Sequence, residues 1–415
     1  MNYFYKVFIL FIFYSFTSFL TAQDIDFKSD IYALMKDNSK SKVRKKVRKF
    51  FRILNSRELS DDKKYKINQV LAEFNDRGLD FNSHYVPFFT LFLECHGNDK
   101  KSSVFNDLLD FLIENNDVYT DLHLKHLFSN IERFLTSNTL YVGEGFSWKC
   151  FGNFNLFFED NGNLNFHFLD SELILFNHHD TIQLFNTTGD YDIIENIFSG
   201  IYAESDFLND DLFVEFDFYN FPLDLKKKFF QIENTSFSCV GVVTSACQGV
   251  YKNQLSSSNK YPSFKSNTHN ESLIIFDDFY FMSGLQLKGD DVFFNRDGGV
   301  IDIKFQDDNM NYLFLSDNFQ LIDGKLLSAN VEFSIQNQFG SIHHPYVQFL
   351  YDDHQKQISI DRLSGKRGLN PIRNTLHGLN MYIDRMEIDL VEDNCLLFHY
   401  SPGRDIQVLF ESDQY

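Results

Sequence analysis

The sequence predicts an α+β protein, in which an N-terminal helical bundle precedes an all-β region built as a sandwich, a jelly roll or a solenoid. Apolar residues recur at a spacing of three and four up to about residue 139, which is the period of a helix. From Tyr141 the spacing changes to two, the period of a strand. Hydrophobic residues make up 43% of the 415 positions and charged residues 23%, so the chain has enough apolar side chains for a folded core.

The first 22 residues predict a secretory signal peptide. Lys6 precedes an apolar run from Val7 to Phe13, polar residues dilute the stretch after that run, and Ala22 is a small residue at the junction. This order is typical of an export signal, whereas a membrane anchor needs about 20 apolar residues. We therefore expect cleavage after Ala22 and an exported protein of the periplasm, the outer-membrane surface or the medium. No transmembrane span is expected in the mature chain.

Residues 23–140 are predicted to form a helical module. Apolar side chains recur at helical spacing over residues 61–74, 84–95, 102–114 and 121–135. A further stretch, from Lys36 to Arg52, combines nine basic residues with an apolar stripe. A basic amphipathic helix can meet an anionic lipid surface or an acidic partner. It can equally be a solvated face, or complement the acidic remainder of the same protein.

Residues 141–255 and 256–415 are expected to form two β segments. Short alternating runs succeed one another at intervals of about 8 to 12 residues, separated by turn residues. Asn161-Gly162 is typical of a two-residue hairpin turn, and a loop rich in Ser and Asn near residues 254–260 divides the two segments. This spacing is typical of sandwiches, jelly rolls and solenoids alike.

The charge balance excludes one class of partner. Lys and Arg total 38 against 58 Asp and Glu, a formal net charge of -20. Such a field repels phosphate backbones, so we expect no nucleic-acid partner. The 50 phenylalanines lie mostly in patterned runs, which favours core positions over exposed stacking platforms.

Five cysteines remain in the predicted exported chain, so at most two disulfides can form. Cys239 and Cys247 are close enough in sequence to close a small loop in an oxidising compartment. Buried, reduced cysteines that act as small apolar side chains are the equal alternative. No C-x-x-C motif and no spacing of Cys and His that suggests zinc occurs, so no metal site and no cofactor are expected.

A dense group of polar residues occupies the last third of the chain, and it comprises His343, His344, Asp352, Asp353, His354, Arg362, Lys366, Arg367, Asn374 and His377. If the strands bring these residues together, they supply the acid, base and cation that polysaccharide cleavage needs. Turns, strand ends and hydrogen bonds to backbone explain the same residues structurally. The chain has no G-x-S-x-G, P-loop or H-E-x-x-H motif. We therefore assign no catalytic, cofactor-binding or metal-binding residue.

Four segments carry a resemblance to known proteins: Tyr261 to Ser266, Ser283 to Gly289, Ser341 to Pro345, and Leu363 to His377. Their order resembles the N-terminal part of very large, uncharacterised exported proteins of the Bacteroidota. The resemblance implies a signal peptide, a helical region and a long run of strands, and it implies no active residue. Those proteins are richer in tryptophan and several times longer, whereas this chain has only Trp148. A shortened member or a fragment is therefore expected.

These observations predict a non-enzymatic envelope protein with a β-rich scaffold that binds a partner, which could be an envelope protein or a glycan. One alternative is a polysaccharide-active enzyme on a β scaffold, either a lyase or a glycosidase, that uses the polar group described above. The other alternative is an open β trough, lined by phenylalanine, that carries lipid.

Overall fold

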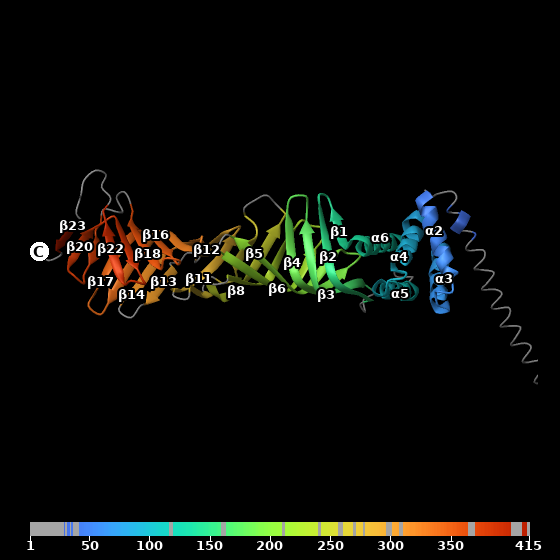
Figure 1. Cartoon of the computed structure of the whole chain (residues 1–415), viewed down its shortest axis with the longest axis horizontal. Helices are drawn as coiled ribbons and strands as arrows, with labels where there is room; N and C mark the ends of the chain where they lie inside the picture. Colours follow the sequence, from blue (N-terminus) through green and yellow to red (C-terminus); the bar gives the residue numbers. More distant parts are fainter. Residues whose placement is uncertain are drawn as a thin grey trace, which may run out of the picture. The chain divides into compact units, whose positions relative to one another are not determined.

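The computed structural model describes Ser29, residues 31–33, Met35 and residues 41–412, except for residues 116–118, 159–162, 210–211, 240–241, 256–259, 269–270, 277–278, 296–300, 307–309, 364–369 and 400–408 (Figure 1). The predicted signal peptide lies outside these described residues. The chain divides into two compact units. The first unit comprises Met1–Leu175, Thr188–Ser199 and Asp224–Lys226, and the second comprises Phe176–Thr187, Gly200–Leu223 and Lys227–Tyr415.

The first unit contains the predicted helical region, which is confirmed. Its helices are α2 (Ser41–Leu54), α3 (Asp61–Asp76), the π-helical turn η1 (Phe81–Tyr85), α4 (Val86–Cys95), α5 (Asp99–Glu114) and α6 (Asp121–Ser137). Polar caps set the helix starts: the side chain of Ser60 accepts the backbone N–H of Lys63 in α3, and that of Thr120 accepts the N–H of His123 in α6. Helix α5 begins three residues earlier than the sequence predicts, because Asn98 provides its cap.

Phenylalanine rings hold the helices around α4. The ring centroid of Phe50 on α2 lies 4.3 Å from that of Phe89 and 5.0 Å from that of Phe92. Phe105 on α5 lies 5.5 Å from Phe88. The rings are fully buried, so they form the core that the apolar stripes predict.

The rest of the chain is antiparallel β structure, as expected. The strands are β1 (Thr139–Gly143), β2 (Phe146–Phe158), β3 (Leu164–Phe176), β4 (Thr181–Asp192), β5 (Ile197–Asn209), β6 (Leu212–Asp224), β7 (Phe229–Cys239), β8 (Val243–Gln254), β9 (Ser263–Ser266), β10 (Glu271–Ile275), β11 (Phe279–Lys288), β12 (Asp291–Asn295), β13 (Ile301–Gln306), β14 (Asn311–Ser316), β15 (Asn318–Ile322), β16 (Lys325–Asn337), β17 (Gly340–Asp352), β18 (Gln357–Arg362), β19 (Ile372–Asn374), β20 (Leu379–Tyr382), β21 (Arg385–Asp389), β22 (Asn394–Phe398) and β23 (Leu409–Ser412).

The long strands bend at a two-residue break that changes which side chains point inward. In β4, Ile182 and Leu184 are buried, Phe185 and Asn186 are more exposed, and burial resumes at Thr187. Equivalent breaks occur at residues 169–170, 201–202, 219–220, 233–234, 329–330 and 345–346. Side chains alternate between the faces of a strand, so an extra outward residue restores the apolar series to the inner face after the bend.

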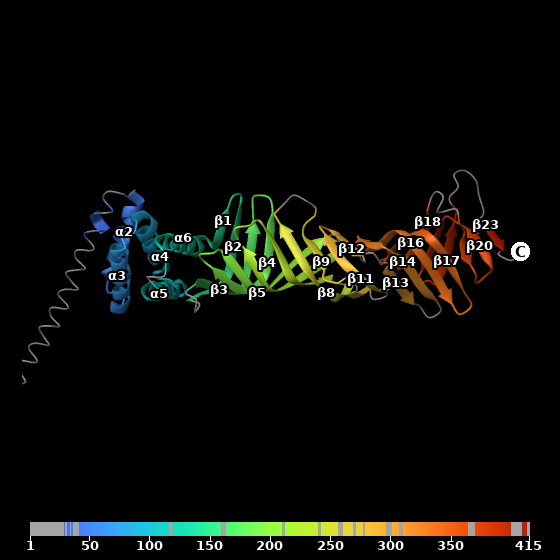
Figure 2. The same ribbon diagram turned by 180° about the vertical axis from the view of Figure 1, so that it is seen from behind.

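In the second unit part of the sheet closes on itself. Strands β11, β12, β15, β16, β14 and β13 pair in a continuous ring. Figures 1 and 2 show this part of the sheet from opposite sides. Phe279 of β11 and Tyr351 of β17 meet inside, with ring centroids 4.5 Å apart, although β13, β14 and β16 separate their strands in the sheet. Both rings are fully buried, so inward phenylalanines fill the interior.

All five cysteines lie among the described residues and are outside any disulfide. Cys239 and Cys247 both point into the buried side of β7 and β8, where Phe237 pairs with Cys247 and Cys239 pairs with Val243. The structure therefore agrees with the alternative of reduced, buried cysteines. Burial raises the pKa of the Cys239 thiol to about 11, which keeps it protonated and poorly reactive at neutral pH.

A substitution at Gly249 of β8 tests how tightly the second unit is packed. A Cβ atom at this position would overlap the carbonyl oxygen of Lys265 and the ring of Phe264 on β9. We expect Gly249→Ala to lower the free energy of unfolding by about 2 kcal/mol, because the backbone of β9 must move. Urea unfolding followed by circular dichroism measures the change. The exposed neighbour provides the control: Gln248→Ala should leave stability within about 0.5 kcal/mol, and equal effects of the two substitutions would contradict the packing argument.

Candidate functional site

The polar residues grouped in the last third of the sequence do not converge. Asp352 lies at the end of β17, whereas Arg362 pairs with Val347 in the middle of that strand. Asn374, three residues before His377, pairs with Ile342 near the start of β17. At about 3.3 Å per residue, these pairing positions lie about 17 Å and about 33 Å from Asp352 along the strand. Lys366 and Arg367 lie outside the described residues.

Local contacts account for the placed members of that group. The Asp352 carboxylate lies 3.1 Å from Lys325 Nζ, and the Arg362 guanidinium lies 3.3 Å from the Asp384 carboxylate. Burial is the largest single influence on Asp352 and opposes its ionisation. The hydrogen bond with Lys325, the charge of that lysine and the backbone N–H groups that the carboxylate accepts together outweigh burial, so the pKa of Asp352 is lowered.

Two of the four histidines, His343 and His344, also have structural partners. His344 is completely buried beside the break in β17, where its ring accepts the backbone N–H of Tyr346, and burial lowers the pKa of the ring. His343 lies 3.1 Å from Glu332 on the neighbouring strand. These residues therefore brace strands and turns, and they do not form the catalytic cluster that the sequence made conceivable.

A different group of residues does converge, in a hollow of about 690 Å³ on β7, β8, β9 and β11. Four lysines line it: Lys252, Lys260, Lys265 and Lys288. We call it the lysine hollow. All four lysines are exposed and all belong to the second unit.

Strand register brings these lysines together. Ser263 of β9 pairs with Lys252 of β8 on one side and with Lys288 of β11 on the other. In the next row, Lys265 pairs with Val250 and Gln286. Adjacent strands lie about 4.8 Å apart, so the backbones at Lys252 and Lys288 are about 10 Å apart, with Ser263 between them. Lys260 reaches the hollow from the loop before β9.

The hollow is strongly cationic. None of the described residues that line it is acidic, and none of its four lysines forms an ion pair with any described residue. The ammonium group of Lys288 lies 5.7 Å from the centroid of the Phe293 ring, which is a cation–π contact. Neighbouring like charges on a sheet repel each other, so this arrangement costs stability until an anion neutralises it.

The remaining lining residues suit hydroxyl groups. Gln231, Gln286, Asn267 and Ser263 offer amide and hydroxyl groups around the lysines, and Tyr261 contributes an aromatic ring. Polar groups of this kind, set around an aromatic surface, orient a ligand by hydrogen bonds and by packing against its apolar faces. The hollow therefore combines charge recognition with partners for a polyhydroxylated molecule.

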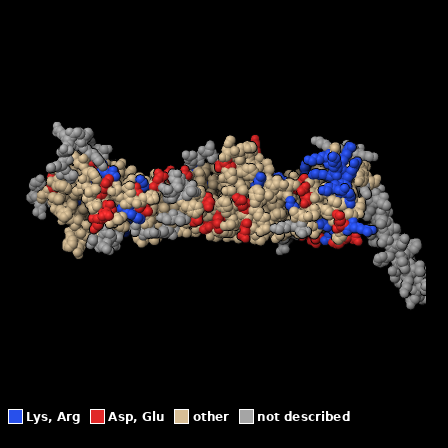
Figure 3. Space-filling view, in the orientation of Figure 1, with Lys and Arg blue, Asp and Glu red and all other residues tan. Residues whose placement is uncertain are grey.

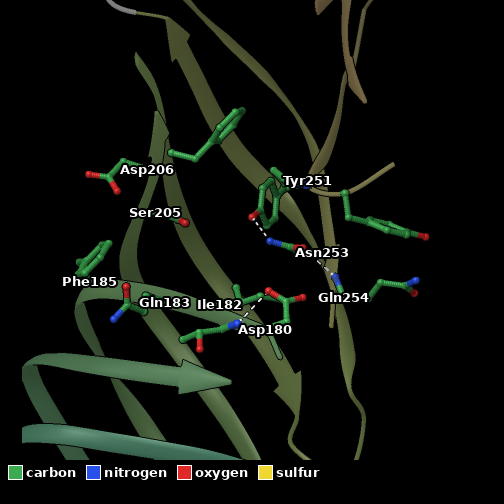
Figure 4. A pocket seen from close by; sticks show the side chains of 13 residues that line it. Asp180, Ile182, Gln183, Phe185, Ser205, Asp206, Tyr251, Asn253 and Gln254 are labelled. Atoms are coloured by element: carbon green, nitrogen blue, oxygen red, sulfur yellow. Dashed lines mark hydrogen bonds between the residues drawn. The ribbon is translucent and has the colours of Figure 1, made fainter. Parts of the chain in front are cut away.

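A second, smaller hollow of about 260 Å³ shares Tyr261 with the lysine hollow (Figure 4). Its lining includes the carboxylates of Asp180 and Asp206 and the amide of Asn253. The Asn253 side chain donates a 2.7 Å hydrogen bond to the hydroxyl oxygen of Tyr251. Burial raises the pKa of Tyr251, so its hydroxyl stays neutral and can still donate. This hollow offers hydrogen-bond partners without a net positive charge.

The sequence did not single out the lysine hollow. Its lysines are spread over residues 252–288 at no regular spacing, and the loop between β8 and β9 interrupts them. The available signal was the alternation in β9, where Ser263 and Lys265 flank buried Phe264. That alternation identifies an outward face, but only strand pairing identifies the neighbours of Lys265 on that face.

Other kinds of site find no support within the described part of the chain. Those residues contain no group of three or more His, Cys, Asp or Glu side chains that could hold a metal ion. They likewise include no helix with the length and hydropathy needed to cross a bilayer.

Substitution of Lys325 and of Lys265 distinguishes a lysine that stabilises the fold from a lysine that is available for binding. Lys325→Gln leaves the Asp352 carboxylate without its cation in a site where that side chain is only 9% exposed, so we expect a loss of about 1–2 kcal/mol in unfolding free energy. Lys265→Gln removes like-charge repulsion and no ion pair, so stability should stay within about 0.5 kcal/mol or rise. Urea unfolding at low ionic strength measures both; a larger loss for Lys265→Gln would mean that the lysine hollow is a structural element.

Comparison with known proteins assigns no relative to this arrangement, since no family model, no curated protein and no solved structure matches the chain.

Proposed function

We propose that the chain is a non-enzymatic, exported envelope protein whose β scaffold binds an anionic glycan at the lysine hollow. The observation that carries the proposal is the convergence of four lysines, without a described acidic partner, in a chain whose net charge is -20. A glycan that bears carboxylate or sulfate groups would supply the missing negative charge. Its hydroxyl groups would use the amides around the lysines.

The spacing of the lysines favours a polymer over a single small anion. Lys252 and Lys288 lie on opposite sides of Ser263, and their backbones are about 10 Å apart. One anion cannot contact both ammonium groups closely unless the side chains fold towards each other, whereas successive charged sugars can each meet one lysine. The volume of about 690 Å³ is in the range of ligand sites that hold more than one small group.

The bent antiparallel strands support a sandwich-like scaffold over a jelly roll or a solenoid. Each break turns a strand so that both halves keep their apolar residues inward, and contacts such as Phe279 with Tyr351 join strands that are distant in the sheet. A rigid interior of this kind leaves the outer face, where the lysines lie, available for binding.

The two alternative functions receive less support. A polysaccharide-cleaving enzyme is less well supported, because its candidate residues Asp352, Arg362 and His377 lie on or beside separate parts of β17. An open lipid trough is also less well supported, because inward phenylalanines such as Phe216, Phe218 and Phe264 are at most 1% exposed and cannot line an open groove.

Binding to acidic polysaccharide tests the proposed ligand. We expect the protein to bind polygalacturonate and not a neutral glucan, and we expect the combined Lys252→Gln, Lys265→Gln and Lys288→Gln variant to bind roughly 30-fold more weakly, at somewhat under 1 kcal/mol per exposed cation. Calorimetry at two salt concentrations measures the affinity, which should fall as salt rises.

A matched variant separates the hollow from the net charge. Lys125, Lys226 and Lys304 are exposed and do not line the hollow, and replacing all three by Gln changes the charge equally. This control variant should keep the wild-type affinity. Equal losses in the two triple variants, or no binding of the wild-type protein to the acidic polymer, would contradict a specific site.

Export is tested separately. Expression of the full chain in a Gram-negative host should yield protein in the envelope or periplasmic fraction, with Gln23 as its first residue by mass spectrometry. Recovery in the cytosol with residues 1–22 retained would refute the proposed location and leave the binding proposal standing.

A further inference from the structure

One face of helix α2 is buried within the first unit. Val47, Phe50, Phe51, Ile53 and Leu54 are buried. Phe50 packs against rings of α4, as described above. The apolar side of this helix is therefore committed to the protein core and is not available to enter a bilayer.

The opposite face of α2 is cationic. Its exposed basic residues are Lys42, Arg44, Lys45, Arg48, Lys49 and Arg52. With 3.6 residues per turn and a rise of 1.5 Å, these side chains cover an arc of about 160° over a length of about 15 Å. Figure 3 shows the blue side chains gathered over α2, whereas red side chains are scattered over the β region in the same view. The helix contains no Asp or Glu.

Most of this charge has no partner in the described part of the protein. Lys46, at the border of the face, donates a hydrogen bond to Thr90 and lies 4.0 Å from Glu132. No ion pair joins Lys42, Lys45, Arg48, Lys49 or Arg52 to any described residue. The expectation that this helix complements the acidic remainder of the chain therefore finds no support in these contacts.

We propose that the exposed face of α2 docks the protein onto an anionic lipid surface, by charge and without insertion. An interface with a protein concentrates its energy in buried aromatic and arginine anchors with a polar rim. The outer face of α2 offers arginines but no exposed aromatic or large apolar side chain that could join them in a buried centre, and it presents charge of a single sign over a broad arc. That pattern suits a surface of mobile anionic headgroups, on which each nearby Lys or Arg adds to the attraction.

The inference does not depend on the proposed glycan site, because it rests on residues of the first unit only. It does account for how an acidic chain can associate with an anionic surface: the cations are collected on one helix, and screening limits the repulsion from the remaining charges to about 8–10 Å at physiological salt.

Vesicle binding tests the inference. The chain without residues 1–22 is mixed with vesicles of phosphatidylcholine alone or with phosphatidylglycerol added, and co-sedimentation is measured. We expect at least roughly 100-fold stronger partitioning onto the anionic vesicles, lost at high salt. Replacing Lys45, Arg48, Lys49 and Arg52 together by Gln should lower the partition coefficient by at least roughly 100-fold, while the thermal unfolding curve stays unchanged because these side chains are exposed.

The combined Lys252→Gln, Lys260→Gln, Lys265→Gln and Lys288→Gln variant also removes four exposed cations and is the matched control, and it should bind the vesicles as the wild-type protein does. Equal binding to both vesicle types, or equal binding by the α2 variant, would overturn the proposal. An equal loss in the lysine-hollow variant would overturn the assignment to α2. Absence of binding to either vesicle type would leave an acidic protein as the partner of this face, which is also a refutation.

Discussion

The two-residue break within β3 to β7, β16 and β17 is the constraint on which much of the β region depends. A strand places alternate side chains on opposite faces. A gently curved strand can keep one face towards the interior along its whole length, but a sharply bent strand cannot do so without a break in the alternation. The breaks in β4 and its neighbours change the parity of the apolar series and keep both halves of each strand facing the same interior. Asn186 and Asn220, which adopt positive φ at two of these breaks, are residues that tolerate this conformation. Phenylalanine then fills the interior from several strands, as the contact between Phe279 and Tyr351 illustrates.

Strand pairing next to the closed ring creates the lysine hollow. Once β8, β9 and β11 are in register, Lys252 and Lys288 must lie on either side of Ser263, and Lys265 must lie in the next row. Their shared face is the outer one because the inner positions of these strands are apolar. The packing of Gly249 beneath β9 adds to this precision, since a larger residue would displace the strand that carries Lys265. Fold and site are therefore consequences of one register.

Charge is distributed unevenly in each unit. The acidic residues of the β region lie mainly at turns and on outward positions, where many accept backbone hydrogen bonds, as Asp389 does from Val391 and Glu392. Two groups of cations stand out, one on α2 and one around the lysine hollow. Both groups are exposed and have few acidic partners among the described residues, so neither is explained by the stability of the fold. Their surroundings differ, because α2 presents charge alone whereas the lysine hollow adds amides, hydroxyl groups and Tyr261. That difference is the basis for assigning a lipid surface to one and a glycan to the other.

The sequence by itself determined the change from helix to strand near residue 139, the presence of the helices but not their exact bounds, and the β character of the remaining region, because hydrophobic period and turn residues are local properties. The basic helix could also be predicted from the sequence, since its cations are clustered in one short stretch of the chain. Only the tertiary structure decided the rest. Asp352, Arg362 and His377 are close in sequence but are held at separate places along β17, whereas Lys252, Lys265 and Lys288 are spaced irregularly in sequence and become neighbours. The physical reason is that cross-strand neighbours are set by register, which the packed interior fixes and no local pattern encodes.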